Sequence, residues 1–158
     1  MKKQFIGFLV FMVAAVFSGA LYAQAVFTIA SVAGDVEKAF SLEEMLALDQ
    51  VEITTSNEFV DGERVFRGPL IRNLLQLYRA GDAQHVIFTA ANDYQVEVDV
   101  TEFYKYDAIL ALSMDGELLS KREKGPVWVI YPMSDHIELR DPVFNSRLIW
   151  QLVKLEYR

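Results

Sequence analysis

Few side chains in this sequence have the types and spacings that carry out catalysis. The chain contains no cysteine, which excludes disulfide bonds and thiolate chemistry. His85 and His136 lie far apart, whereas a metal site needs three or four clustered ligands. The chain has no serine nucleophile elbow, no glycine-rich phosphate-binding loop and no zinc-protease motif. The sequence therefore predicts no metal site and identifies no catalytic residue.

Polar side chains do gather where predicted strands end or turn, and such positions present recognition groups on a rigid scaffold. Two groups of these side chains have a second interpretation. Asn92 and Asp93 also suit an ordinary turn, and the hydroxyls of 54–56 also suit a solvated strand edge. The candidate binding residues are Thr55, Ser56, Asn57, Arg67, Asn92, Asp93, Tyr94, Tyr131 and His136.

The most apolar short run must help to position these residues. Five apolar residues, 127–131, lie between Gly125-Pro126 and Pro132. A run this short, rich in β-branched and aromatic residues, predicts a strand buried on both faces. We expect it to be the central strand, and we expect Trp128 and Trp150 to lie in the core.

The remaining pattern predicts strands with two short helices. A capping box at Ser41 and Glu44 predicts a helix from Leu42. Gly68-Pro69 opens a second helix, whose end is predicted at Gly81. Strands are predicted at 27–30, 51–54, 65–66, 85–90, 94–100, 108–112 and 148–157. Because strands and helices do not alternate regularly, we expect one α+β domain with a mixed sheet over 26–158.

The first 25 residues read as a secretory signal peptide. A basic start, an apolar run from Phe5 to Phe17 and the small-residue site Ala23-Gln24-Ala25 are typical of one. The apolar run is short for a transmembrane helix, so we expect cleavage, a periplasmic protein and no membrane span afterwards. Retention as an uncleaved anchor is the alternative.

The charge balance limits the partners. The chain carries 15 basic and 22 acidic residues, a net charge of −7. The predicted signal peptide holds two lysines and no acid, so its removal leaves a net charge of −9. An acidic protein is a poor partner for nucleic acid or anionic lipid.

Four segments, taken in order, resemble the sulfite-oxidase-type molybdopterin-binding domain family. These are an aromatic-x-Gly-hydrophobic segment before a Leu-Leu helix, a turn, a hairpin with Asp-Gly, and a Gly-Pro strand that ends in proline. In this sequence they are Phe66–Leu70 with Leu74-Leu75, Ala91–Tyr94, Leu110–Leu118 and Lys124–Pro132. The resemblance is closest to small exported members and implies their fold, an oxidoreductase activity and molybdopterin as cofactor.

The sequence departs from that family where the metal would bind. Catalytic members ligate molybdenum through a cysteine, and the corresponding segment here, Glu52–Asn57, has none. Thr55 or Ser56 could offer an oxygen, which is a poorer donor than a thiolate. The family also implies basic residues for the pterin phosphate, for which the candidates are Arg67, Lys121, Arg122, Lys124 and Arg147.

The signal segment gives a second departure. The family implies a cofactor inserted before export through the twin-arginine route, whereas this segment begins with Lys2-Lys3. We therefore predict a periplasmic binding module without molybdenum, whose partner is a small molecule or a periplasmic or membrane protein. An oxidoreductase that uses an oxygen ligand is the first alternative, and an assembly factor that reuses the fold is the second.

Overall fold

The computed structural model of the chain describes residues 24–158. The predicted signal peptide falls almost wholly on residues 1–23 and so lies outside the described residues. No helix in the described part is both long enough and apolar enough to cross a membrane.

The largest sheet has five strands in the order β2-β1-β11-β5-β6. Neighbouring strands are antiparallel, except that β1 and β11 are parallel. The last strand of the chain therefore lies between the first strand and the β5–β6 hairpin, which makes the sheet mixed, as predicted. The five strands are β1 (Ala25–Ser31), β2 (Glu37–Ser41), β5 (His85–Ala90), β6 (Gln95–Asp99) and β11 (Leu152–Tyr157).

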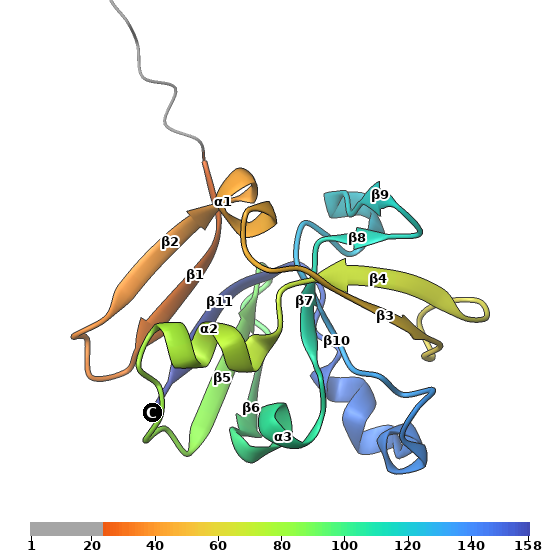
Figure 1. Cartoon of the computed structure of the whole chain (residues 1–158). Helices are drawn as coiled ribbons and strands as arrows, with labels where there is room; N and C mark the ends of the chain where they lie inside the picture. Colours follow the sequence, from red (N-terminus) through yellow and green to blue (C-terminus); the bar gives the residue numbers. More distant parts are fainter. Residues whose placement is uncertain (1–23) are drawn as a thin grey trace, which may run out of the picture.

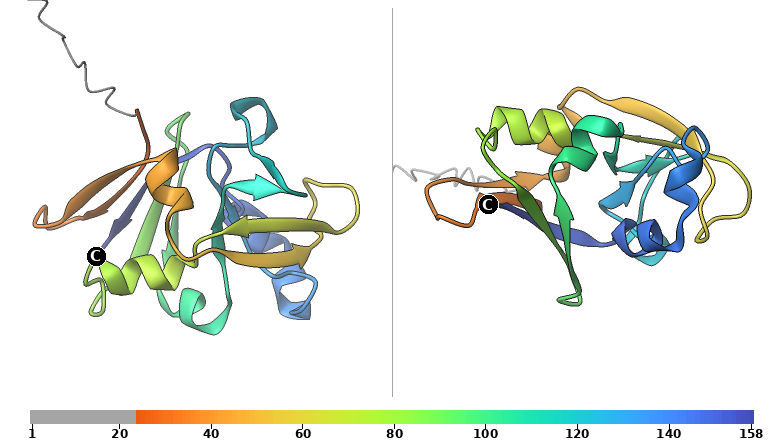
Figure 2. Two further views of the ribbon diagram at one scale, coloured as in Figure 1. Left: turned by 45° about the horizontal axis from the view of Figure 1, so that its top comes forward. Right: turned by 90° about the horizontal axis from the view of Figure 1, so that it is seen from below.

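Two smaller sheets complete the domain. An antiparallel sheet of four strands has the order β3-β4-β8-β9, and a separate pair joins β7 to β10. Figures 1 and 2 show the β3–β4 hairpin on the opposite side of the molecule from the β1–β2 hairpin, with β7 and β10 between them. These strands are β3 (Val51–Thr55), β4 (Arg64–Gly68), β7 (Ile109–Ala111), β8 (Ser113–Met114), β9 (Glu117–Leu118) and β10 (Trp128–Ile130).

Strand β10 contributes to two hydrophobic clusters at once. Val129 packs in the cluster that includes α2 and the five-stranded sheet, whereas Trp128 and Ile130 pack in a second cluster with Phe66. All three β10 side chains are at most 1% exposed, so the strand is buried on both faces, as predicted. Its predicted position at the centre of the sheet is wrong, because in residues 24–158 β10 pairs with β7 alone.

The helices follow the sequence signals closely at their starts. Helix α1 (Leu42–Leu46) begins at the predicted capping box, in which the Ser41 hydroxyl accepts a hydrogen bond from Glu44 N at 3.1 Å. Helix α2 (Ile71–Leu77) ends earlier than predicted, because Arg79 already has a left-handed backbone with φ of 59°. The end predicted at Gly81 is therefore wrong. A third short helix, α3 (Thr101–Lys105), follows β6.

The polar segment before β11 is more ordered than the loop its composition suggests. It forms two 3₁₀ helices, and the Asp141 carboxylate caps the second by accepting a hydrogen bond from Val143 N at 2.9 Å. Trp150, which follows them, is 40% exposed and does not lie in the core, contrary to the prediction. The three 3₁₀ helices of the described chain are η1 (Lys121–Glu123), η2 (Ile137–Arg140) and η3 (Pro142–Arg147).

The glycine of the aromatic-x-Gly segment has a packing role. A Cβ atom on Gly68 would lie 1.9 Å from the carbonyl oxygen of Leu110, so only glycine lets β4 approach β7 this closely. This contact brings the four-stranded sheet against the β7–β10 pair.

We predict that Leu74→Ala lowers the free energy of unfolding by about 2–5 kcal/mol, because Leu74 is 2% exposed in the core cluster. Leu77→Ala is the matched control on the same helix, since Leu77 is 61% exposed, and its loss should be within about 0.5 kcal/mol. Urea unfolding measures both changes. Equal losses in the two variants would show that the buried face of α2 is assigned wrongly.

Candidate functional site

The end of β3 is joined to the loop that follows β10. The Thr55 hydroxyl accepts a hydrogen bond from Ser134 N at 3.0 Å, and the Ser134 hydroxyl accepts one from Ser56 N at 3.1 Å. The Thr55 hydroxyl also donates to the Ser56 carbonyl at 3.3 Å. We call this set the Thr55–Ser134 contact. Thr55 is fully buried, so its hydroxyl is used inside the fold.

Asn57 orients the loop that begins after β3. Its Oδ1 accepts a hydrogen bond from Phe59 N at 2.9 Å. Its Nδ2 is buried and has no hydrogen-bond partner among residues 24–158. A buried donor without an acceptor is costly, and Asn57 does not line the cavity described next.

Phe59 forms one wall of a cavity of about 360 Å³. Three segments far apart in the sequence meet there: the loop after β3, the tip of the β5–β6 hairpin, and the chain from η3 to β11. The Phe59 and Trp150 rings lie 5.0 Å apart between centroids at 75°, an edge-to-face arrangement. We call this the aromatic cavity; it is lined by Glu58, Phe59, Ala90, Asn92, Tyr94, Asn145, Ser146, Leu148, Ile149 and Trp150.

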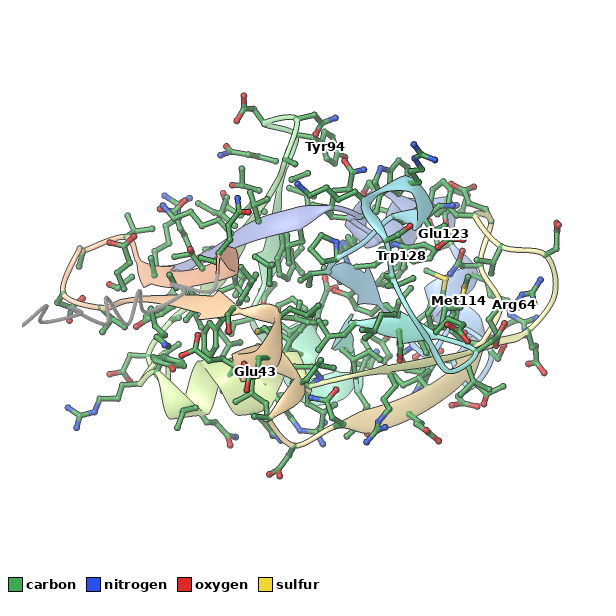
Figure 3. The ribbon with its side chains drawn as sticks, turned by 90° about the horizontal axis from the view of Figure 1, so that it is seen from above. Glu43, Arg64, Tyr94, Met114, Glu123 and Trp128 are labelled. Atoms are coloured by element: carbon green, nitrogen blue, oxygen red, sulfur yellow. The ribbon has the colours of Figure 1, made fainter. Side chains whose placement is uncertain are left out.

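The turn 92–94 contributes both to local structure and to the cavity. Asn92 Oδ1 accepts a hydrogen bond from Tyr94 N at 3.2 Å, and Asp93 has a left-handed φ of 64°, as turn residues often do. Asn92 and Tyr94 also line the aromatic cavity, whereas Asp93 does not. Figure 3 shows Tyr94 near the tip of its hairpin, away from the interior position of Trp128.

Arg67 lies apart from the hydroxyls of Thr55 and Ser56. In the β3–β4 register Thr55 faces Arg64, while Arg67 faces Glu52 three residues further along. Since side chains alternate between the faces of a strand, Arg67 is on the exposed face and Thr55 on the buried face. The structure therefore does not bring these two candidate residues together.

Tyr131 belongs to a buried polar group rather than to an open surface. Its hydroxyl donates a hydrogen bond to Glu102 Oε2 at 3.4 Å, and Glu102 also pairs with Arg147. The Glu102 and Arg147 side chains are only 17% and 19% exposed. Burial raises the pKa of the Glu102 carboxyl against the lowering effect of Arg147, and burial also raises the pKa of the Tyr131 phenol.

His136 is not part of the Tyr131–Glu102–Arg147 group and contacts Tyr106 instead. Its ring packs edge-to-face on Tyr106, with centroids 5.0 Å apart. The Tyr106 hydroxyl donates to Glu138 Oε1 at 3.0 Å. The predicted site residues thus fall into several separate groups, and their functional roles remain predictions.

Sequence reasoning missed Phe59, Asn145 and Trp150, which the fold brings together at the cavity. For Phe59 the available signal was an aromatic side chain shortly after the polar residue Asn57, outside any predicted strand. Trp150 gave no such signal, because it falls within the strand predicted at 148–157. The periodicity gave no reason to pair segments some 90 residues apart.

Comparison with known proteins establishes the family. The model of the oxidoreductase molybdopterin binding domain matches residues 26–134. This chain belongs to that family. The match spans most of the described chain and agrees with the resemblance noted from the sequence motifs.

A solved structure agrees with the family assignment. The sulfane dehydrogenase SoxCD from Paracoccus pantotrophus aligns with a TM-score of 0.63 and 13% sequence identity. The alignment covers 83% of this chain but 37% of that one, so the chain spans well under half of its structural relative. This similarity establishes the shared fold. No curated protein sequence gives a significant match to the chain.

The residues present do not fit a molybdenum held by a thiolate. Cysteine is absent from the chain, and residues 24–158 contain no group of three or more histidines and acids placed to hold a metal. The Thr55 hydroxyl is already engaged on both sides. The half-buried Ser56 is the remaining candidate among the two proposed oxygen ligands.

The basic residues proposed for a pterin phosphate lie outside the aromatic cavity. Arg147 is paired with Glu102, and the ammonium of Lys124 lies over the Trp128 ring, 5.3 Å from its centroid. Arg67, Lys121 and Arg122 are exposed on β4 and η1. Lys121, Arg122 and Lys124 lie together at η1, whereas Arg67 is on β4, and none of the five lines the aromatic cavity.

We predict that Thr55→Val destabilises the fold by about 1–3 kcal/mol, because it leaves the half-buried Ser134 amide without its acceptor and removes a fully buried hydroxyl from its hydrogen bonds. Thr54→Val is the matched control, since the neighbouring Thr54 is exposed on the same strand. Thermal and urea unfolding of the two variants measure the difference. Similar stabilities would contradict an internal role for the Thr55 hydroxyl.

We predict that the stability of the wild type falls relative to Glu102→Gln as the pH rises from about 4.5, the ordinary glutamate pKa, to above the raised pKa of Glu102. The folded state binds the Glu102 proton more tightly than the unfolded state, so its removal costs stability. Urea unfolding across this pH range measures the difference. A relative gain in wild-type stability would show that the ion pair with Arg147 outweighs the cost of burial.

Proposed function

We propose that this chain is an exported, metal-free binding module that has kept the molybdopterin-binding fold and holds a small molecule in the aromatic cavity. One observation carries the proposal: the fold retains a ligand-sized cavity while the segment matched to the metal ligand is engaged in the Thr55–Ser134 contact. Fold alone does not fix function, which depends on the residues of the site.

The segment where the family has its cysteine ligand supports the proposal that this chain binds no metal. A structural replacement for a metal ligand would present a free donor, but the Thr55 hydroxyl is buried and hydrogen-bonded. A neutral hydroxyl is also a weaker donor than a thiolate.

The cavity supports the binding part. Ligand pockets are concave, mostly apolar and lined by aromatic side chains with a few polar groups. Tyr94 and Trp150 are 48% and 40% exposed, although large aromatic side chains usually lie in cores. Both rings line the cavity, where a ligand would cover their exposed surface.

The predicted signal peptide supports a periplasmic location. Its Lys2-Lys3 start suits export of an unfolded chain, which would reach the periplasm before any ligand is bound. The expected partner is a periplasmic or membrane protein that recognises the ligand-bound form of this chain.

The test begins with protein purified from its own periplasm. Elemental analysis should find molybdenum far below one atom per chain. Near-stoichiometric molybdenum that Ser56→Ala removes would overturn the proposal in favour of an oxidoreductase with an oxygen ligand.

A thermal-shift screen of small metabolites tests the binding part on the same protein. Compounds that raise the melting temperature of the wild type should fail to stabilise Trp150→Ala. Tyr104→Ala is the control, because Tyr104 is 46% exposed on α3 and does not line the cavity. Stabilisation that survives in Trp150→Ala would place the binding site elsewhere.

A further inference from the structure

We infer that the aromatic cavity binds a small organic cation of the quaternary-ammonium or methylated-amine class. This inference deepens the proposed function and rests on it. The aromatic rings and the single charged side chain that line the cavity favour such a cation.

Three aromatic residues line one cavity. Phe59 and Trp150 meet at 75° with centroids 5.0 Å apart, so they form two walls of a corner. Tyr94, from the separate β5–β6 hairpin, lines the same cavity. The faces of aromatic rings carry partial negative charge, and several rings around one point attract an alkylated ammonium group.

The charge of the lining has one sign. Glu58 is the only side chain charged at neutral pH among the described residues that line the cavity, and it is exposed. No lysine, arginine or histidine belongs to the lining. The other polar side chains, Asn92, Asn145 and Ser146, are neutral, so an organic cation meets no repulsion there.

The same features disfavour an anion. The nearest basic residue along the chain is Arg147, whose guanidinium is paired with Glu102 and does not line the cavity. The chain itself has a net charge of −7. A phosphate, sulfite or carboxylate would therefore be repelled without compensation.

The size of the cavity agrees with a small ligand. Its volume of about 360 Å³ lies near the lower end of the usual range for ligand pockets, about 300–1,000 Å³. A cavity of this size suits an ammonium group with a short polar tail.

Isothermal titration of the mature protein with choline and with 3,3-dimethylbutan-1-ol tests the inference. The two probes have nearly the same shape, but only choline is charged. We expect choline to bind at least about ten-fold more tightly, since the cation–ring attraction in a partly desolvated site is of that order. Equal affinities would overturn the inference.

Two variants separate the sources of the attraction. Trp150→Leu keeps apolar surface but removes the ring, so it should weaken choline more than the neutral alcohol. Glu58→Gln should weaken choline alone. Glu63→Gln is the matched control, since Glu63 is exposed in the same β3–β4 loop outside the cavity.

The possible failures are distinguishable. Absence of binding by choline and by tetramethylammonium overturns the cation assignment, while the metabolite screen on Trp150→Ala still tests the binding module itself. Choline binding that Trp150→Leu and Glu58→Gln leave unchanged would also overturn the assignment, because the site would then lie elsewhere. The molybdenum content is measured independently of the choline titration and of the metabolite screen.

Discussion

The Thr55–Ser134 contact joins the end of β3 to the loop after β10 across 79 residues of sequence. The two hydrogen bonds that join these segments are made at Thr55 and Ser56, in the segment that corresponds, by family resemblance, to the molybdenum ligand. Because buried polar groups must find partners, the hydroxyls of Thr55 and Ser134 form hydrogen bonds within the fold. The contact is made at the last residue of β3 and at the first residue of the loop that leads to Phe59.

The two hydrophobic clusters are held together through β10. Trp128 faces the β3–β4 side while Val129 faces the five-stranded sheet, so one short strand serves both. Gly68 allows β4 to approach β7 at a distance that any side chain would prevent. This rigid centre leaves the loop after β3, the β5–β6 hairpin and the chain after η3 to meet at one edge, where they form the aromatic cavity.

Local signals predicted much of the fold. The capping box at Ser41 and the alternation in β6 each have a cause within a few residues, and the structure has both. These local signals could not predict the strand order, because the pairing of β11 between β1 and β5 depends on long-range packing. The cavity was missed for the same reason: Trp150 was assigned to the core from its residue type, and only the fold brings it to Phe59.

The central claim is that the segment matched to the metal ligand is closed by internal hydrogen bonds. Amide hydrogen exchange of Ser56 and Ser134, measured by NMR on the mature protein, tests it most directly. We expect both amides to exchange slowly, as the buried strand amides do, and Thr55→Val to accelerate Ser134. Exchange in the wild type as fast as that of the exposed turn residue Gly62 would contradict the claim.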